Sequence, residues 1–529
     1  MQRLSHVFLL AWGWRRWGLA LFAGAASALS LAPLGWFAVL WLTFPALVWL
    51  LDGAIAAEGT GRRRFRPAMA VGWWFGFGYH LAGLWWIGRA FLVDAEAFAW
   101  LLPAAVLAMP AGLALFSALS GAIAALFWRS GWPRIVVLAF ALSLTDWLRG
   151  TILTGFPWNT FGQAFAGNLV LVQGASIVGA YGLGFLAILI FAAPAVLADE
   201  APGRRIFAGL AALLLALMAG FGFFRLSQES PGEVADTAIR IVQPAIPQEE
   251  KWLPENRANV FSTYVEMSGR PFPEALAGAS RRLTIWPESA VPFLLTEEPG
   301  ALAAIAGFLK PGETLVTGAI RSEIRGEQRV FYNSIFSIAD DGTIVDAYDK
   351  VRLVPFGEYV PLEGFFEALG IRGLVQGAGT FEAGFRQRPM RLDGLPAFLP
   401  LVCYEIIFPG IASTSEEEAG WILNVTNDAW FGMTAGPYQH LVQARLRAVE
   451  QGMPVIRAAN TGISAIFDSR GRILDRLELG VRGAIDAALP ARLPPTFYAR
   501  HGLSLFFIAL LVSFGFIFIL RLKINTRND

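Results

Sequence analysis

Eight apolar stretches constrain this chain more than any other feature, because most of them are close to the length of about 20 residues that a helix needs to cross a bilayer, although the fourth is long and the fifth is short. They cover residues 17–33, 36–56, 68–88, 98–128, 134–148, 168–198, 205–224 and 503–520. Hydrophobic residues make up 55% of the 529 residues and charged residues only 16%, so the chain is more apolar than a soluble fold of this length. We therefore predict a polytopic α-helical membrane bundle of eight spans, with a tilt or kink at Pro103 and Pro110 in the long fourth span.

The basic residues that flank the spans predict the orientation of the chain, because Arg and Lys near span ends stay on the cytoplasmic side of a membrane. With eight spans, these residues all fall on one side: Arg3, Arg15, Arg16, Arg62, Arg63, Arg64, Arg66, Arg129, Arg134, Arg204, Arg205, Arg521, Lys523 and Arg527. The opposite short loops carry little beyond Arg89 and Arg149. Both termini are therefore expected in the cytoplasm, and residues 226–500 in the periplasm of a Gram-negative cell. A cleaved signal peptide at the N-terminus is the alternative, but removing the first span would invert this arrangement.

Residues 226–500 differ in texture from the rest of the chain, since their apolar runs are short and alternate with turn residues. Strand-like runs begin near residues 239, 282, 313, 330, 343, 397, 421, 454 and 463, and helical patterns cover residues 298–309 and 437–451. This alternation predicts an α/β domain with a core of its own. The expected layout is a seven-span domain over residues 1–225, an outer α/β domain over 226–500, and a last span with a cytoplasmic tail over 501–529.

Reactive side chains follow three of the predicted strands, at the sheet edge where polar chemistry collects. The run RLTIW leads through Pro287 to Glu288, TIVDAYD leads to Lys350, and AFLPLV leads to Cys403, the single cysteine of the chain. A lone thiol makes no internal disulfide and no CxxC metal site, so its chemical use would be as a nucleophile; a small hydrophobic core residue is the plainer interpretation. A carboxylate, an amine and a thiol at strand ends can converge as base, oxyanion stabiliser and nucleophile.

Other chemistries find little support in the sequence. The four histidines, His6, His80, His440 and His501, form no HExxH or Cys/His cluster, so we expect no metal and no cofactor. His440 lies in a helical run, where a surface or capping role is expected, although a Cys-His dyad stays open. The sequence has no Walker motif and no GxGxxG after a strand, and its net charge of +1 gives no basic field for nucleic acid.

Three motifs together resemble the nitrilase, or carbon-nitrogen hydrolase, superfamily. IWPES around Glu288, YDKVRLVPFGEYVP around Lys350 and LVCYE around Cys403 match its Glu-Lys-Cys triad in order. The membrane layout, with LTDWLRGTILTGFPWN from residue 144 and NDAWFG from residue 427, is similar to the membrane-embedded branch of that superfamily, the apolipoprotein N-acyltransferases. The resemblance covers essentially the whole chain and implies a nitrilase-like α-β-β-α sandwich for the outer domain, which would then be catalytic.

The resemblance also implies a role for each matching residue. Glu288 would be the general base, Lys350 the stabiliser of the oxyanion and transition state, and Cys403 the acylated nucleophile. Further matching positions are the acid Glu358 beside the triad, Tyr404 and Glu405 after the nucleophile, and Trp252 and Trp430 at the substrate entrance. The backbone N–H of Tyr404 would help to form the oxyanion hole.

The family reaction that this resemblance implies is ping-pong acyl transfer through a thioester on Cys403. The acyl chain would leave the sn-1 position of a phospholipid, usually phosphatidylethanolamine, and pass to the α-amine of the diacylglyceryl-cysteine of an apolipoprotein. The implied partners are a phospholipid donor, an apolipoprotein acceptor and membrane lipid, with the enzyme a monomer in the bacterial inner membrane. The competing hypotheses are a membrane-tethered amidase or nitrilase with the same triad, and a non-enzymatic transporter or binding protein.

Two further features each have two interpretations. Residues 356–375 form an apolar run that is either ordinary core packing or a lid at the outer leaflet: Phe356, Tyr359, Leu362, Phe365, Phe366, Leu369 and Leu374. A transferase has to keep water away from its thioester, which favours the lid. Asp146 and Arg149, near the outer end of the fifth span, either bind lipid headgroups or form a structural salt bridge.

Overall fold

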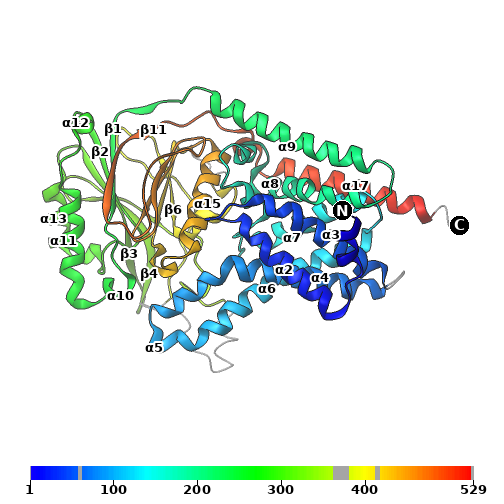
Figure 1. The fold of residues 1–529 in the computed structure, drawn as a ribbon. Coiled ribbons are helices and arrows are strands. Elements are labelled where there is room, and N and C mark those ends of the chain that lie inside the picture. The colour runs from blue at the N-terminus through cyan, green and yellow to red at the C-terminus, as the bar shows by residue number, and fades with distance from the viewer. Residues whose placement is uncertain (1, 58–61, 362–379, 412–417, 526–529) are drawn as a thin grey trace. The chain divides into compact units, whose positions relative to one another are not determined.

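The computed structural model describes residues 2–57, 62–361, 380–411 and 418–525, which form two compact units. The first unit combines Met1–Gln228 with Thr496–Asp529, and the second is Glu229–Pro495. All strands of the described chain belong to the second unit, whereas the first is helical (Figure 1).

The first unit is built from apolar helices, which satisfy their own backbone hydrogen bonds as a segment in lipid requires. Its helices are α1 (Gln2–Leu9), α2 (Gly13–Ser27), α3 (Leu40–Ala56), α4 (Phe65–Leu84), α5 (Ala95–Phe98), α6 (Leu102–Phe127), α7 (Pro133–Thr151), α8 (Ala175–Ala192), α9 (Arg204–Ser227), α16 (Phe497–His501) and α17 (Ser504–Asn525). Within the described residues, five helical segments are long and apolar enough to cross a membrane: Phe37–Ala56, Ala95–Phe127, Leu171–Ala198, Arg204–Ser227 and Ser504–Leu522. The other three predicted spans coincide with α2, α4 and α7, so the count of eight spans stays a prediction.

Glycines allow three of these helices to touch backbone to backbone. A Cβ on Gly78 of α4 would lie 2.1 Å from the carbonyl oxygen of Leu21 on α2, and a Cβ on Gly72 would lie 2.1 Å from that of Ser117 on α6. Helices in lipid often associate through small residues that allow close packing. Burying apolar side chains against another helix gives little stabilisation there, because the lipid around them is equally apolar. The glycines of α4 therefore fix its packing against both neighbours.

Asp146 and Arg149 form a structural salt bridge near the end of α7. Arg149 Nη2 lies 2.5 Å from Asp146 Oδ1, and both side chains are buried. The guanidinium also donates to the carbonyl oxygens of Phe156, at 2.5 Å, and Trp158, at 2.7 Å. Because these contacts tie down the loop after α7, the geometry favours the structural interpretation of this pair over a headgroup site.

The second unit contains two β-sheets, ordered β11-β1-β2-β3-β4-β5 and β10-β9-β8-β7-β6 (Figure 1). The strands are β1 (Glu233–Gln243), β2 (Arg281–Trp286), β3 (Glu313–Arg325), β4 (Gln328–Ile338), β5 (Ile344–Asp349), β6 (Phe398–Val402), β7 (Trp421–Thr426), β8 (Val455–Ala459), β9 (Ser464–Phe467), β10 (Ile473–Leu477) and β11 (Gly483–Pro490). The runs β1-β2-β3 and β6-β7-β8 are parallel. Side chains that follow parallel neighbours therefore gather at one edge of each sheet.

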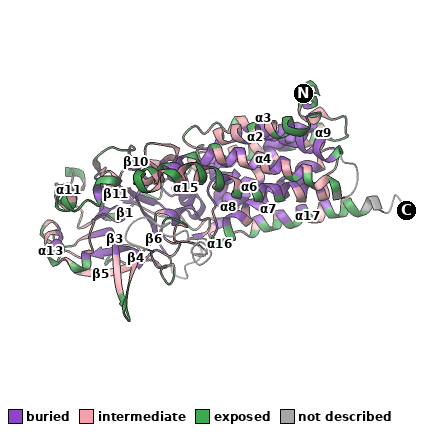
Figure 2. Ribbon diagram, turned by 90° about the horizontal axis from the view of Figure 1, so that it is seen from below, coloured by how far each residue is buried: buried purple, intermediate pink, exposed green. Residues whose placement is uncertain are grey.

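The two sheets pack face to face over one apolar core. Ile285 of β2 and Val425 of β7 belong to the same cluster of fully buried side chains. Figure 2 shows the buried residues of this unit gathered in its middle. A second cluster, with Tyr264, Trp286 and Ile305, joins the outer face of the six-stranded sheet to α11 (Arg257–Ser268) and α13 (Pro299–Phe308). The helix α15 (Ala435–Gln451) packs on β8, and the short helices α10 (Gln248–Lys251) and α12 (Glu274–Ala277) complete the unit. The unit is thus an α-β-β-α sandwich, as predicted.

The nine predicted strands correspond to β1 through β9, and the two predicted helices correspond to α13 and α15. The strands β10 and β11 lie outside the sequence prediction. β10 has the sequence ILDRL and is mostly exposed, whereas β11 has the alanine-rich sequence GAIDAALP, and neither shows strand-forming residues in a clear alternation. Both are held in place by pairing with β9 and β1, which local sequence does not encode.

Candidate active site

Glu288 follows β2 directly, and its buried carboxylate has fixed hydrogen-bond donors. Oε1 accepts from Asn333 Nδ2 at 2.8 Å, and Oε2 accepts from the backbone N–H of Asn427 at 2.7 Å. The backbone at Glu288 also lies against Gly318 of β3, where an added Cβ would be 2.5 Å from Glu288 Cα. The carboxylate is thus oriented from both sheets.

Lys350 follows β5, and its ammonium lies between two carboxylates. Nζ is 2.8 Å from Glu358 Oε1 and 3.8 Å from Glu288 Oε1, and the side chain is only 1% exposed. Burial alone would lower the pKa of this ammonium, but the charges of Glu358, Glu288 and Cys403 and the hydrogen bond that it donates to Glu358 raise the pKa above its ordinary value. Lys350 is therefore a permanent cation at neutral pH.

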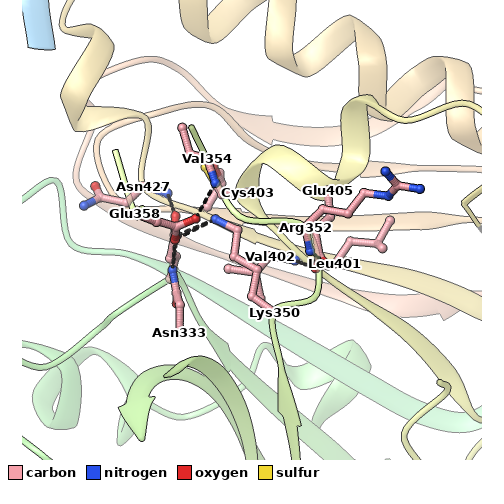
Figure 3. A network of polar contacts seen from close by, with 12 residues as sticks. Asn333, Lys350, Arg352, Val354, Glu358, Leu401, Val402, Cys403, Glu405 and Asn427 are labelled. Atoms are coloured by element: carbon pink, nitrogen blue, oxygen red, sulfur yellow. Dashed lines mark hydrogen bonds and ion pairs between the residues drawn. The ribbon is translucent and has the colours of Figure 1, made fainter. Parts of the chain in front are cut away.

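Glu358 completes the network around this lysine (Figure 3). Its Oε1 accepts from Asn333 Nδ2 at 2.9 Å, and its Oε2 accepts from the backbone N–H of Val354 at 2.7 Å. The amide of Asn333 therefore touches both carboxylates that flank Lys350. Such buried networks hold their members rigidly when every carboxylate oxygen has a donor.

Cys403 begins the 3-10 turn Cys403–Ile407, directly after β6. Its φ of +49° is in the left-handed region, which costs a non-glycine residue strain and turns the thiol out of the line of the strand. The residue is half-buried, and burial raises the pKa of its thiol, with the charge of Glu288 adding to the rise while Lys350 opposes it. The sulfur is therefore a thiol at neutral pH and has to lose its proton as it reacts.

Glu405 ties the nucleophile turn to the loop after Lys350. One oxygen accepts from the backbone N–H of Val402 at 2.8 Å, and the other from those of Val351, at 2.9 Å, and Arg352, at 3.1 Å. The same oxygen accepts from the hydroxyl of Tyr348 at 2.9 Å. Glu405 is fully buried, so its place is structural: it fixes two strand ends relative to one another.

The charges of Glu288 and Lys350 both act on the thiol of Cys403, so the structure brings the three predicted residues together. The apolipoprotein N-acyltransferase N-terminal domain matches residues 23–193, and the carbon-nitrogen hydrolase domain matches residues 238–494. The chain is 48% identical to the apolipoprotein N-acyltransferase of Rhodopseudomonas palustris, over 95% of this chain and 94% of that protein.

This chain belongs to the apolipoprotein N-acyltransferase family. It is also 46% identical to the apolipoprotein N-acyltransferase of Bradyrhizobium diazoefficiens, again over 95% of this chain and 94% of that protein. Among solved structures, an amidase from Nesterenkonia sp. matches 50% of this chain and 94% of its own at 19% identity and a TM-score of 0.33. Saccharomyces cerevisiae Nit3, of the nitrilase superfamily, matches 50% of this chain and 92% of its own at 20% identity and a TM-score of 0.35.

The three aromatic residues predicted from the family resemblance, Trp252, Trp430 and Tyr404, lie in three different segments. Trp252 follows α10 and is 41% exposed, with the ammonium of Lys251 5.6 Å from its ring centre. Trp430 lies in the 3-10 turn Asp428–Phe431 and is half-buried. Tyr404 is buried, and its ring meets that of Phe408 edge-on at 5.1 Å. The exposure of Trp252 suits a position that substrate reaches, whereas the ring of Tyr404 packs into the protein.

The structure adds site residues that sequence reasoning did not single out. Asn333 and Asn427 supply hydrogen bonds to Glu288, and Lys251 is fully buried with its Nζ 3.5 Å from the carbonyl oxygen of Glu288. Burial lowers the pKa of Lys251 to about 8, against the attraction of Glu288. Polar residues in apolar strand sequences, such as Asn333 in VFYNSIFSI, are the one signal that could have marked them.

The expectation of a surface or capping role for His440 is wrong. The ring is fully buried, with Nδ1 2.8 Å from Asp428 Oδ1 and Nε2 3.1 Å from the carbonyl oxygen of Cys403. Because α15 packs inward on the turn that carries Cys403, a polar residue of this helix becomes part of the site. Both ring nitrogens are engaged by these contacts, so the geometry does not favour His440 as a base for the thiol.

One group of side chains in the described residues has the spacing of metal ligands. The donor atoms of Cys403, Asp428 and His440 all lie within 4.8 Å of one another. However, Arg457 Nη2 lies 2.6 Å from Asp428 Oδ2 and 3.1 Å from His440 Nδ1. A guanidinium in this position repels a second cation, so these residues do not fit a metal ion.

The predicted lid lies largely outside the described residues, because Leu362, Phe365, Phe366, Leu369 and Leu374 fall in residues 362–379. Two of its members are described. Phe356 is 51% exposed and has a φ of +62°, and Tyr359 is half-buried. The exposed ring of Phe356 directly precedes the short loop to Glu358, so at least this apolar side chain stands outside the core of the second unit.

Proposed function

We propose that this protein transfers an acyl chain from the sn-1 position of a phospholipid to the α-amine of the diacylglyceryl-cysteine of an apolipoprotein, through a thioester on Cys403. The observation that carries the proposal is the convergence of Glu288 and Lys350 on one thiol at adjoining strand ends, with Glu358 paired to Lys350. Membership of the apolipoprotein N-acyltransferase family supports the choice of acceptor. The reaction is the last step of lipoprotein maturation.

In the first half-reaction, the sulfur of Cys403 attacks the ester carbonyl of the donor. The thiol proton passes to Glu288, the carbon–sulfur bond forms, and the carbonyl oxygen becomes an oxyanion. Lys350 and the backbone N–H of Tyr404 stabilise that oxyanion. The ester C–O bond then breaks, and the lyso-phospholipid leaves with the proton that Glu288 held.

In the second half-reaction, the neutral α-amine of the acceptor attacks the thioester. Glu288 takes a proton from the attacking nitrogen, the carbon–nitrogen bond forms, and the carbon–sulfur bond breaks. The sulfur regains a proton, which restores the thiol that burial favours. The burial of Glu288 and Lys350 supports this route, because a water-poor site prolongs the life of the thioester.

The donor in this proposal is phosphatidylethanolamine, as the family resemblance implies, and the enzyme acts as a monomer without a cofactor. Trp252 and Trp430 line the entrance through which the lipids arrive. Phe356, at the described start of the predicted lid, helps to shield the thioester from water. The exposure of Phe356 and Trp252 supports an apolar surface near the site.

The membrane placement in this proposal follows the arginine distribution and the apolar helices. The chain has eight spans in the bacterial inner membrane, seven in a domain over residues 1–225 and one in residues 501–529. Both termini lie in the cytoplasm, and the catalytic domain over residues 226–500 lies in the periplasm. This placement gives the thiol access to lipids of the outer leaflet.

The function is tested with purified protein and phosphatidylethanolamine that carries a labelled sn-1 chain. We expect label on Cys403, and its transfer to the amine of an added diacylglyceryl lipopeptide. Cys403→Ser should fold normally and acquire no thioester. Release of the label as free fatty acid would identify a hydrolase instead, and the absence of label from both the protein and the lipopeptide would contradict enzymatic acyl transfer.

A further inference from the structure

A buried polar cluster lies behind Cys403, and the proposed reaction does not use it. It consists of Thr426 at the end of β7, Asp428 in the following turn, His440 on α15 and Arg457 on β8. All four side chains are fully buried. Burying four polar groups is unfavourable unless they are fully paired. Their position next to the nucleophile therefore suggests a role in the reaction.

The hydroxyl of Thr426 is the member of this cluster that reaches the sulfur. Its Oγ1 lies 3.2 Å from Cys403 Sγ and 3.0 Å from Asp428 Oδ1. A hydroxyl carries one hydrogen, so it donates to only one of these two acceptors at a time. While Cys403 is a thiol, the carboxylate is the stronger acceptor, and once Cys403 is a thiolate the sulfur becomes a second anionic acceptor.

Asp428 does not depend on Thr426 for its charge to be satisfied. Arg457 Nη2 is 2.6 Å from Oδ2, and His440 Nδ1 is 2.8 Å from Oδ1. Burial alone would raise the pKa of Asp428, but Arg457 and then His440 lower it to about 2. The carboxylate is therefore a fixed anion with other donors, and Thr426 can withdraw its hydrogen at small cost.

We propose that Thr426 is a catalytic residue whose hydroxyl donates to Asp428 while Cys403 is a thiol and to Cys403 Sγ while the sulfur is anionic. The proposal rests on the acyl transfer proposed above and deepens it. No bond to Thr426 breaks: the thiol proton goes to Glu288, and the hydrogen of Thr426 stays on Oγ1 and changes only its acceptor. The same hydroxyl stabilises the anionic sulfur when the carbon–sulfur bond of the thioester breaks, so it lowers the barrier of both half-reactions.

The surroundings of the sulfur explain why such a donor is needed. Glu288 and Asp428 both oppose a negative charge on Cys403, and Lys350, which favours it, is shared with Glu358. Within the described site, the hydroxyl of Thr426 is hydrogen-bonded to Sγ, and the same hydroxyl contacts Asp428.

The test compares side chains of matched shape with and without the hydroxyl, in the full-length protein. Thr426→Val replaces the hydroxyl by a methyl, and the pair Thr426→Ser and Thr426→Ala gives the same comparison in a smaller side chain. Thr343→Val, at an exposed turn between β4 and β5, is the matched control. Two rates are measured: acylation of Cys403 by labelled phosphatidylethanolamine, and alkylation of Cys403 by iodoacetamide across pH.

We expect Thr426→Val to slow acylation roughly tenfold to a hundredfold relative to the wild type, and Thr426→Ala to slow it by a similar factor relative to Thr426→Ser. In both hydroxyl-free variants the alkylation profile should move to higher pH, whereas Thr426→Ser and Thr343→Val should keep the wild-type profile. Equal slowing in Thr426→Ser and Thr426→Ala, or an unchanged alkylation profile in Thr426→Val, would overturn the proposal in favour of a packing role. Alkylation reads the sulfur alone, so this comparison still decides the role of Thr426 if phosphatidylethanolamine proves not to acylate Cys403.

Discussion

At the scale of single residues, the site depends on how charge is distributed around one thiol. The carboxylates of Glu288 and Glu358 keep Lys350 protonated, and the amide of Asn333 joins the two carboxylates. Cys403 itself stays neutral until it reacts, because burial disfavours its anion. A nucleophile of this kind requires a base at the moment of attack, and Glu288 is the base that we propose.

Glu288→Gln should remove that base while leaving the fold intact, because an amide can keep one acceptor oxygen for Asn333 or Asn427. We expect thioester formation to fall by at least about a hundredfold, within the range usual for a lost general base. Quantifying acylated Cys403 against time gives the rate, with Glu274→Gln at an exposed position as the matched control. Normal acylation combined with failed transfer to the lipopeptide would place the base elsewhere.

Lys251 gives a prediction about pH and stability. Its pKa is lowered from the ordinary 10.5 to about 8 in the folded protein, so between these values the unfolded chain binds more protons than the folded chain. This group therefore makes the folded protein more stable as pH rises from 8 towards 10.5, by about 3 kcal/mol over the whole window. Lys251→Met should remove this rise.

Unfolding in detergent at several pH values between 7.5 and 10 measures the effect, as the stability of Lys251→Met minus that of the wild type. The difference should shrink as pH increases, whereas the matched loss of an exposed lysine in Lys310→Met should leave the wild-type slope in place. A difference between Lys251→Met and the wild type that stays constant with pH would mean that folding does not lower the pKa of Lys251.

At the scale of elements, the site exists because strands from two sheets end near one another. Glu288 follows β2, Lys350 follows β5 and Cys403 follows β6, and Glu405 ties the last two strand ends together. The close approach of β3 to the residues after β2 is what places Glu288, and Gly318 makes that approach possible. The packing of these strand ends therefore sets the positions of the three candidate residues.

Gly318→Ala tests this packing. The added Cβ would lie 2.5 Å from Glu288 Cα and 2.6 Å from the carbonyl oxygen of Pro287, so the backbone has to move. We expect a loss of about 1 to 3 kcal/mol in stability together with a fall in acylation rate, as for an overpacked core. Gly307→Ala, in α13 with no atom near the new methyl, should be neutral or stabilising in thermal unfolding. Wild-type acylation in Gly318→Ala would show that the position of Glu288 tolerates such a shift.

The sequence predicted the elements better than the contacts between them. Strands β1 through β9 have apolar cores bounded by turn residues, so local pattern was sufficient, whereas β10 and β11 depend on pairing partners far away in the chain. Motifs identified Glu288, Lys350 and Cys403, since each follows a strand. The burial of His440 was not predictable, because a helix that reads as amphipathic in sequence gives no sign of which polar side chain faces a buried turn.

At the scale of the whole molecule, the first unit supplies helices suited to lipid and the second supplies the reactive groups. Five helical segments of the described chain are long and apolar enough to cross a membrane. The orientation of the chain therefore depends on whether α2, α4 and α7 also cross it. An odd number of spans would place the termini on opposite sides of the membrane. The arginine distribution predicts eight.

Labelling of single cysteines in intact cells tests this arrangement, because Cys403 is the one native cysteine and Cys403→Ala removes it. In that background we expect Glu96→Cys and Ser230→Cys to react with a membrane-impermeant maleimide, and Glu200→Cys to react only after the membrane is permeabilised. Labelling of Glu200→Cys in intact cells would reverse the predicted topology of the sixth and seventh spans.

In the proposed reaction, Cys403 carries the acyl chain between two substrates. Mass spectrometry of the Cys403 peptide, after mixing enzyme and phosphatidylethanolamine without acceptor, tests this role. We expect one acyl chain per enzyme on that sulfur, removable by hydroxylamine, with an equal amount of lyso-phospholipid released before any lipopeptide is added. Release of lyso-phospholipid only in the presence of lipopeptide, with Cys403 unmodified throughout, would contradict this role and indicate direct transfer.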